Sequence, residues 1–250
     1  IIRAANITKD DMVLEIGPGI GTMTQYLCES TREVVAVEID KNLIPILADT
    51  LSAYDNVEVI NEDILKVDIK TLAEERNHGK PIKVVANLPY YITTPILLKI
   101  LEETSLVNRM VVMMQKEVAL RICGKPSTKD YNCLSVLIQY FTNPKYLFTV
   151  KPGSFYPEPG VDSAVIEIKY KDEIDSVATD LNYFLKFNRN IFAQRRKTLM
   201  NNLQKAYSYK KEDMLNILEN KNISLTIRSE ALSVDEIVDL ANTFYQTFEK

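Results

Sequence analysis

The first two thirds of this 250-residue chain alternate short apolar runs with segments of helical periodicity. This alternation is typical of βαβ units, in which crossover helices join parallel strands. The expected strands cover residues 12–16, 34–39, 57–60, 83–86 and 109–114, and the expected helices cover residues 22–29, 42–51, 94–103 and 116–123. The pattern therefore predicts a doubly wound, Rossmann-like α/β sheet.

The spacing of the apolar residues changes in the second half of the chain. A helix is expected over residues 132–141, and two strands over residues 146–150 and 164–170, which suit the antiparallel edge of such a sheet. Residues 181–249 then show helical periodicity and no strand pattern. We expect a boundary near residue 172, with an α/β domain over residues 1–172 and a small all-helical domain over residues 173–250.

Composition limits the class of protein. With 46% apolar residues the chain can bury a full core, yet no apolar run approaches 18 residues and the first residues show no signal-peptide pattern. The sequence thus predicts a cytoplasmic protein without membrane contact. Three scattered cysteines and a single histidine, His78, fit neither a zinc site nor a disulfide framework, so no metal is expected.

The net charge of −4 is unevenly distributed. Residues 183–211 hold eight lysines and arginines and no acid, so the rest of the chain carries −12. Nucleic-acid binding depends on such a local concentration of positive charge. A solvent-exposed helix face without a ligand would show the same sequence pattern and remains the alternative. The candidate phosphate contacts are Lys186, Arg189, Arg195, Arg196 and Lys197. We expect the last three to lie on a helix, where they would spread around its circumference.

A glycine-rich loop follows the first expected strand. Gly17, Gly19 and Gly21 are spaced G-x-G-x-G, and glycine lets a backbone turn sharply and approach a ligand closely. Dinucleotide binders use G-x-G-x-x-G, whereas this spacing suits the ribose and methionine tail of S-adenosylmethionine. An NAD-type loop and a plain strand–helix turn remain the alternatives. Thr22 or Thr24 is expected to cap the following helix.

Acidic residues end the next two strands. Glu38 ends the second strand, where a carboxylate can accept hydrogen bonds from ribose hydroxyls. Asp63 follows the third strand and can accept from an adenine amino group, while Ile64 can cover the ring. Ligands collect at the carboxyl edge of parallel sheets, so both acids are expected in a cofactor site. Either acid alone could equally be a solvated strand end.

The tetrapeptide Asn87-Leu88-Pro89-Tyr90 closes the fourth expected strand. The N6 lone pair of adenine is delocalised into its ring, so this nitrogen is a poor nucleophile. The Asn87 side-chain oxygen and the Leu88 carbonyl can each accept one N6 hydrogen, Pro89 fixes the backbone, and Tyr90 offers a stacking face. Positioning then supplies the catalysis without a general base. The alternative is an ordinary Asn-x-Pro turn.

A second aromatic candidate lies in the proline-rich segment before the last strand. Phe155 stands in the string Phe155-Tyr156-Pro157-Glu158-Pro159. It is predicted to close the other side of the target adenine, or else to pack the loop onto the domain.

Together these motifs resemble the rRNA adenine N6,N6-dimethyltransferase family. The resemblance covers nearly the whole chain, including the strings 115–119, 155–163 and 192–199, and it extends the cofactor site to Glu15 and Asn87. It implies S-adenosylmethionine as methyl donor, no metal, and a monomer. Leu88 and residues 192–199 resemble the bacterial members that dimethylate two adjacent adenosines near the 3′ end of small-subunit rRNA, in pre-30S particles.

Two other branches of this family are alternatives. The macrolide-resistance methyltransferases act on large-subunit rRNA and more often carry isoleucine in place of Leu88. Mitochondrial transcription-factor relatives are not catalytic, but both the glycine loop and the Asn87 tetrapeptide are intact here. Family members normally begin with a basic segment and a Gly-Gln-x-Phe-Leu stretch, whereas this chain starts at Ile1, so an N-terminal segment is expected to be missing.

Overall fold

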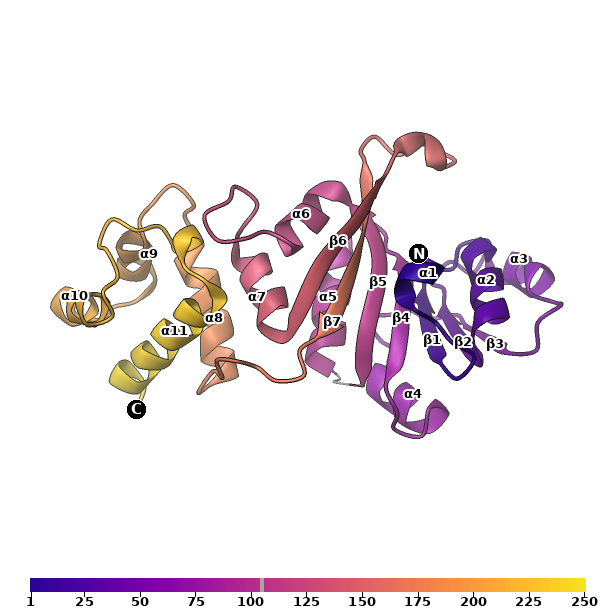
Figure 1. Ribbon diagram of the computed structural model, residues 1–250, viewed down its shortest axis with the longest axis horizontal. Helices are drawn as coiled ribbons and strands as arrows, with labels where there is room; N and C mark the ends of the chain where they lie inside the picture. The colour runs from indigo at the N-terminus through magenta and orange to yellow at the C-terminus, as the bar shows by residue number, and fades with distance from the viewer. Residues whose placement is uncertain (104–105) are drawn as a thin grey trace. The chain divides into compact units, whose positions relative to one another are not determined.

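The computed structural model describes residues 1–103 and 106–250 (Figure 1). Its centre is a seven-stranded sheet of order β3-β2-β1-β4-β5-β7-β6. The strands are β1 (Met12–Ile16), β2 (Glu33–Val37), β3 (Val57–Ile60), β4 (Ile82–Asn87), β5 (Val107–Gln115), β6 (Thr142–Val150) and β7 (Ser163–Tyr170). Strands β1 to β5 pair in parallel, and β7 pairs antiparallel with both β5 and β6. The expected Rossmann-like methyltransferase sheet with an antiparallel edge is confirmed.

The helices fill the connections and the C-terminal part. They are α1 (Ile2–Ala5), α2 (Thr22–Ser30), α3 (Ile44–Thr50), α4 (Ile69–Arg76), α5 (Thr93–Glu103), α6 (Lys116–Ile122), α7 (Cys133–Phe141), α8 (Leu181–Ile191), α9 (Leu199–Ala206), α10 (Lys211–Asn220) and α11 (Val234–Phe248), with 3₁₀ turns at Pro152–Ser154 and Ser229–Ala231. No described helix combines the length and the apolar character that crossing a membrane requires.

Two local expectations were wrong or incomplete. Helix α2 begins after Gly21, which lies in the left-handed region, and no side chain caps it, whereas Thr22 or Thr24 was expected to do so. Thr24 is buried instead. Helix α4 was not predicted, because it buries only Ile69 and Ala73 among charged residues, although Asp68 caps it by accepting a hydrogen bond from the Thr71 N–H.

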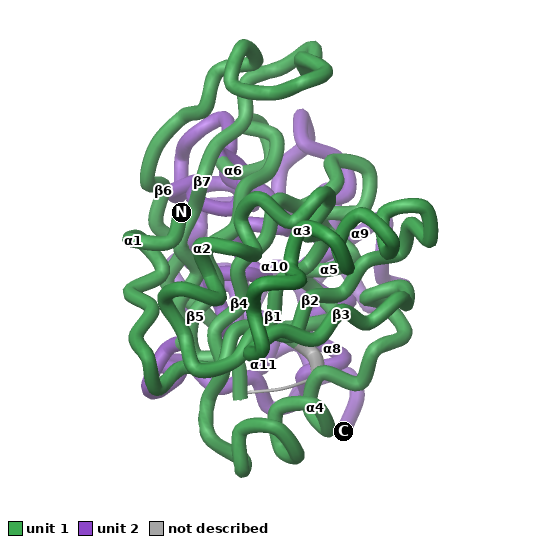
Figure 2. Tube along the Cα trace, turned by 90° about the vertical axis from the view of Figure 1, so that its right-hand side faces the viewer, with its two compact units in different colours: residues 1–119, 142–170 green, residues 120–141, 171–250 purple. Residues whose placement is uncertain are grey.

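The described chain forms two compact units (Figure 2). One comprises residues 1–119 and 142–170, which hold the whole sheet, and the other comprises residues 120–141 and 171–250, which are helical. The second unit therefore takes in α7, which precedes the last two strands in the sequence. The expectation of two separate domains, with a boundary near residue 172, stays a prediction.

The first unit is built around strands that are buried on both faces. All five residues of β1 are buried, which explains why the strand reads as a nearly continuous apolar run. On one face Val13, Val85 and Val111 pack with Leu27 and Cys28 of α2. The parallel pairing of β1 to β4 sets their carboxyl ends side by side along one edge of the sheet.

The second unit buries an aromatic core. Phe184 and Phe187 of α8 pack with Phe244 of α11, and the rings of Phe187 and Phe244 lie 5.3 Å apart. Helix α11 begins with a capping box in which Ser233 and Glu236 exchange hydrogen bonds. The all-helical character expected for the C-terminal part is confirmed.

Candidate methyl-transfer site

Strand order places the predicted site residues in one row along the carboxyl edge of the sheet. Asp63 follows β3, Glu38 follows β2, Gly17 follows β1 and Asn87 ends β4, and these strands are neighbours in that order. Register keeps the row level, since Ile16 pairs with both Val37 and Ala86. Four short motifs spread over about seventy residues of sequence thus meet along one line.

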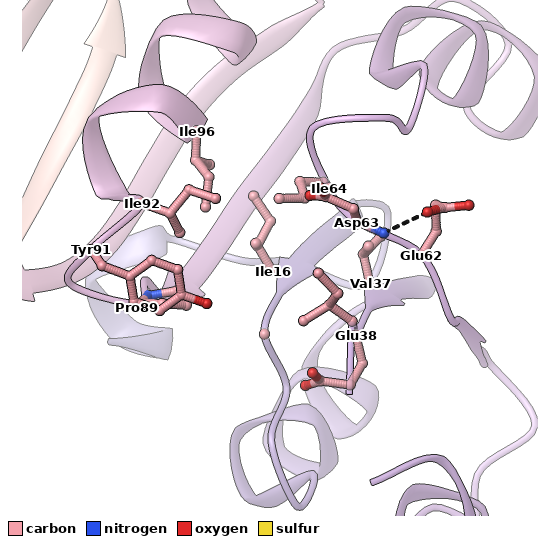
Figure 3. A pocket seen from close by; sticks show the side chains of 12 residues that line it. Ile16, Val37, Glu38, Glu62, Asp63, Ile64, Pro89, Tyr91, Ile92 and Ile96 are labelled. Carbon is pink, nitrogen blue, oxygen red and sulfur yellow. Dashed lines mark hydrogen bonds between the residues drawn. The ribbon is translucent and has the colours of Figure 1, made fainter. Parts of the chain in front are cut away.

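A pocket opens on this row (Figure 3). Figure 3 shows Tyr91 and Pro89 on one side, Glu38, Asp63 and Ile64 on the other, and Ile16 between them. The wall is mainly apolar with a few acids, which suits a flat ring carrying polar groups. The lining residues are Ile16, Gly17, Val37, Glu38, Ile39, Glu62, Asp63, Ile64, Pro89, Tyr91, Ile92 and Ile96.

Glu38 organises the glycine loop. Its Oε2 accepts a hydrogen bond from the Gly19 N–H at 3.2 Å, and its Oε1 accepts one from the Asp40 N–H at 2.9 Å. Each carboxylate oxygen has two lone pairs, so both can also accept from a ligand hydroxyl. Glu38 therefore holds the loop in place and still offers acceptors at the pocket wall.

The three loop glycines have different surroundings. Gly17 has φ +68°, and a Cβ added there would meet only the Asn87 carbonyl oxygen, at 3.7 Å. Gly21 has φ +88°, and a Cβ there would press on the Leu47 side chain at 3.1 Å. Gly17 thus leaves space beside the row, whereas Gly21 serves the packing of α2 on α3. A Cβ on Gly19 would meet nothing within 4 Å.

Asp63 and Ile64 lie together at the far end of the pocket. Asp63 Oδ1 accepts a hydrogen bond from the Leu65 N–H at 2.9 Å, and the Asp63 N–H donates to Glu62 Oε1 at 2.8 Å. Ile64 is buried. An acid beside an apolar wall fits the recognition of an adenine amino group and ring face.

Glu15 lies inside the sheet and not at the pocket wall. Its side chain is 0% exposed, and neither carboxylate oxygen has a hydrogen-bond partner within the described part of the chain. Burial, opposed by the nearby Thr24 hydroxyl and assisted by the charge of Glu38, raises the pKa of Glu15 to about 7. Its assignment to the cofactor site stays a prediction.

The Asn87 tetrapeptide forms the turn between β4 and α5. Asn87 is exposed at the strand end, whereas Leu88 is buried and its N–H donates to the Met113 carbonyl at 2.9 Å. The Pro89 carbonyl accepts from the Thr93 hydroxyl at 3.0 Å, and the Tyr90 hydroxyl lies 2.5 Å from Ser163 Oγ. The turn is therefore held at both ends, and the acceptor roles of Asn87 and Leu88 stay predictions.

Sequence reasoning missed seven residues of this pocket, three of which, Ile16, Val37 and Ile39, lie at or just after the ends of β1 and β2. Tyr91 is 84% exposed and lines it next to Pro89, and Ile92 and Ile96 continue the wall into α5. Glu62 lies beside Asp63 on the other side. The spacing of Ile92 and Ile96 by one helical turn was the available signal, but it reads equally well as core packing.

Phe155 does not line the pocket. It is half-buried and packs against the cluster that contains Val13, Val85 and Val165. Asp162 holds the end of its loop, since Oδ2 accepts from Lys151 Nζ at 2.9 Å and Lys116 Nζ at 3.3 Å. This contact agrees with packing of the loop onto the domain, and closure over adenine stays a prediction.

The basic candidates in the second unit are all exposed. Lys186 and Arg189 lie three residues apart on α8, so they share a side of that helix. The expectation that residues 195–197 are helical was wrong, because they lie in the turn between α8 and α9, where Asn202 accepts from the Gln194 N–H. Arg195 donates to the Lys129 carbonyl and lies 3.9 Å from Glu230.

Comparison with known proteins gives matches over nearly the whole chain. The sequence model of the family described as ribosomal RNA adenine dimethylase matches residues 1–245. The chain is 54% identical over 245 residues to the ribosomal RNA small subunit methyltransferase A of Lachnoclostridium phytofermentans, covering 97% of this chain and 84% of that protein.

Solved structures share the fold over nearly the whole chain. A dimethyladenosine transferase from Plasmodium falciparum matches with TM-score 0.82 and 25% identity, covering 98% of this chain and 94% of that one. The 23S rRNA methyltransferase ErmE matches with TM-score 0.74 and 23% identity, covering 96% and 93%, which shows the fold alone. By the family match and the close relative, this chain belongs to the ribosomal RNA adenine dimethylase family.

Proposed function

We propose that this protein is a small-subunit rRNA adenine dimethyltransferase. It transfers methyl groups from S-adenosylmethionine to N6 of two adjacent adenosines near the 3′ end of 16S rRNA, acting as a cytoplasmic monomer on pre-30S particles. The observation that carries the proposal is the row of Asp63, Glu38, Gly17 and Asn87 along one sheet edge, in a chain of the adenine dimethylase family.

Each residue of the row binds a different part of the cofactor. Asp63 and Ile64 hold the adenine, Glu38 accepts from the ribose hydroxyls, and the space beside Gly17 leaves room for the rest of the cofactor. The fit rests on the apolar pocket wall, the acid at each end, and the missing Cβ at Gly17. S-adenosylmethionine supplies an already activated methyl group, so the protein needs to provide only position and polarity.

Asn87 and the turn after it receive the target base. The Asn87 side-chain oxygen and the Leu88 carbonyl accept the two N6 hydrogens, which concentrates the lone pair on nitrogen and orients it for in-line attack. Tyr90, fixed by Ser163, offers a face for a base taken out of its stack. Phe155 closes the opposite side when its loop rearranges.

Small-subunit rRNA is favoured as the substrate over large-subunit rRNA. The relative with 54% identity is named a small-subunit methyltransferase, while ErmE shares 23% identity. No observation on the pocket favours a dinucleotide, since the glycine loop carries no G-x-G-x-x-G spacing.

Methylation with labelled donor tests the proposal. Naked 16S rRNA, pre-30S particles and 23S rRNA are each incubated with the protein, and the modified nucleotides are mapped. We expect N6,N6-dimethyladenosine at two adjacent positions near the 16S 3′ end, with pre-30S particles preferred. Modification of 23S rRNA alone would reverse the substrate assignment.

A further inference from the structure

Tyr90 carries a hydroxyl group that stacking does not require. A nucleobase stacks on the face of any aromatic side chain, and phenylalanine offers the same face. The Tyr90 hydroxyl lies 2.5 Å from Ser163 Oγ, so the two side chains share a short hydrogen bond that either can donate. Tyr90 is half-buried, and Ser163 is 0% exposed. The phenol oxygen is therefore directed at a buried partner in another strand.

Ser163 is a firm anchor for this bond. It is the first residue of β7, and its backbone pairs with Gln115 of β5 on one side and with Val150 of β6 on the other. The carbonyl of the preceding residue, Asp162, accepts a hydrogen bond from the first N–H of α6 at 3.0 Å. Strands on both sides thus hold the backbone from which the buried hydroxyl reaches Tyr90.

The main chain of Tyr90 is held by separate contacts. The Leu88 N–H donates to the Met113 carbonyl at 2.9 Å, and the Pro89 carbonyl accepts from the Thr93 hydroxyl at 3.0 Å. A side chain held only through its backbone can adopt several staggered rotamers. Tyr90 is fixed at both ends, by the turn at its Cα and by β7 at its hydroxyl, so its ring has one orientation.

We propose that Ser163 is a positioning residue for the target base, which holds the Tyr90 ring in its stacking orientation before the base arrives. This inference rests on the proposed function. A preformed face removes the entropy loss of ordering a side chain on binding. The two aromatic walls then differ, since Tyr90 is fixed by a buried hydrogen bond, whereas Phe155 lies on a loop that has to rearrange to reach the base.

A bond that only supports the fold of the turn would have a different effect, which the neighbouring pocket reports. Pro89, Tyr91 and Ile92 of the same turn line the pocket proposed for the cofactor. If Ser163 supported the turn as a whole, removal of its hydroxyl would also weaken cofactor binding. If it positions the Tyr90 ring alone, cofactor binding is preserved and methyl transfer falls.

A double-mutant cycle tests the bond. Ser163→Ala and Tyr90→Phe each remove it, and the double variant completes the cycle. Methyl transfer from S-adenosylmethionine to pre-30S particles gives kcat and KM, and calorimetry gives the affinity for S-adenosylhomocysteine. We expect kcat to fall roughly three- to tenfold in each single variant, the net effect of one hydrogen bond, and no further in the double variant. The affinity for S-adenosylhomocysteine should stay within about twofold of wild type, because the turn itself is intact.

Two further variants isolate the hydroxyl from the shape of the side chain. Ser163→Thr and Ser163→Val add the same crowding to a buried position, but only threonine keeps a hydroxyl, so it should retain the higher kcat. The matched control is Tyr146→Phe, which removes a comparable hydroxyl pair with Thr149, at 2.6 Å in β6, and should leave kcat unchanged. If Ser163→Ala does not fold, Tyr90→Phe decides by the same two measurements, since it removes the bond from the other side.

The outcomes separate the inference from the proposed function. Unchanged kcat in Ser163→Ala, equal kcat with threonine and valine, or losses that multiply in the double variant would each overturn the inference. A fall in S-adenosylhomocysteine affinity that parallels the fall in kcat would assign the bond to the fold of the turn and overturn it as well. A wild-type protein that neither binds S-adenosylhomocysteine nor methylates pre-30S particles would overturn the proposed function, and the inference with it.

Discussion

The N6 amine of adenine attacks a methyl group readily only when its lone pair is withdrawn from the ring, and we propose that the Asn87 amide side chain has this effect. Asn87 is exposed at the end of β4, while the residue after it is buried and bonded to Met113. The side chain is therefore free to meet a base although its backbone is fixed. That separation lets binding and turnover be tested apart.

The first prediction concerns Asn87→Ala. We expect methyl transfer to fall by about 10²–10³, the usual effect of removing one preorganised polar group from a transition state. Binding of S-adenosylhomocysteine should stay within a few-fold of wild type. Labelled-methyl incorporation and calorimetry measure the two effects, and Asn220→Ala, at an exposed position of α10, is the control. Undiminished turnover would contradict the proposed role.

The second prediction concerns Glu38→Ala. The change removes the acceptors for the Gly19 and Asp40 N–H groups as well as those proposed for ribose. We expect binding of S-adenosylmethionine to weaken by about 1.5–3 kcal/mol, the range for hydrogen bonds to a charged group. Turnover at saturating cofactor should change much less. Calorimetry with both S-adenosylmethionine and S-adenosylhomocysteine checks it, and equal affinity to wild type would exclude the ribose contact.

At the scale of an element, the segment between β6 and β7 depends on one acid. Asp162 pairs with Lys151 and Lys116, and these lysines hold the pKa of the Asp162 carboxyl below its ordinary value. A lowered pKa means that the pairing is fully present above the ordinary value near 3.8 and is lost as pH falls through the lowered value. The segment should therefore stay anchored at neutral pH and loosen only in acid.

The third prediction follows from this anchor. Asp162→Asn should speed chymotryptic cleavage after Phe155 several-fold at pH 7, because the loop loses both ion pairs while the sheet remains. Asp172→Asn, at an exposed position beyond β7, should not. Cleavage rates from mass spectrometry check both, and equal rates for the Asp162 variant and wild type would show that the lysines do not hold the loop.

Several elements could be predicted from the sequence because the apolar pattern of their residues matches their burial in the fold. Strands β1 and β4 are buried on both faces, so their residues are apolar except for Glu15, for Lys83, which pairs with Asp11, and for Asn87 at the end of β4. Helix α4 escaped prediction because only two of its eight residues are buried. Charge composition does not reveal a turn, so the helix that it predicts over residues 195–197 is wrong. The turn found there is held by Asn202, which accepts from the Gln194 N–H and donates to the Ile191 carbonyl.

The site was predicted only in part for a related reason. Glu38 and Asp63 follow strands, so their place on the sheet edge comes directly from topology. Tyr91 has no such signal, since its part in the pocket depends on how the turn after β4 is folded. Glu15 lies in β1 one residue before the strand ends, between Ala36 of β2 and Val85 of β4. That its carboxylate is buried between apolar neighbours depends on the sheet pairing and could not be predicted from its position in the sequence.

For the molecule as a whole, the distribution of charge matters more than its sum. The net charge is −4, yet the exposed cations of the helical unit include Lys186 and Arg189 on one side of α8 and Arg196 and Lys197 in the next turn. Arg195 is already engaged by Glu230 and the Lys129 carbonyl. Contacts to phosphate position an RNA without reading its sequence, so we expect specificity to come from rRNA shape and the extruded adenine.

The fourth prediction distinguishes the cations expected to contact RNA phosphate from Arg195, which is engaged within the protein. Replacing Arg196 and Lys197 by glutamine should weaken binding to 16S rRNA and lower the salt slope by about 0.7–0.9 for each lost phosphate contact. Arg195→Gln should change the slope less and mainly reduce thermal stability. Salt-dependent binding isotherms test this, with S-adenosylmethionine affinity as the internal control. An unaltered slope in the double variant would mean that the rRNA docks elsewhere.

The turn after β4 has a consequence for how the binding of the methyl donor and the binding of RNA affect each other. Pro89, Tyr91 and Ile92 line the pocket that we propose for the cofactor, and we propose that Asn87 and Leu88, in the same stretch of backbone, receive the target base. In this proposal one short segment belongs to two sites, so we expect a ligand that orders the segment at one site to favour binding at the other. Thermodynamic reciprocity then requires that, if bound methyl donor raises the affinity for RNA by some factor, bound RNA raises the affinity for the donor by the same factor.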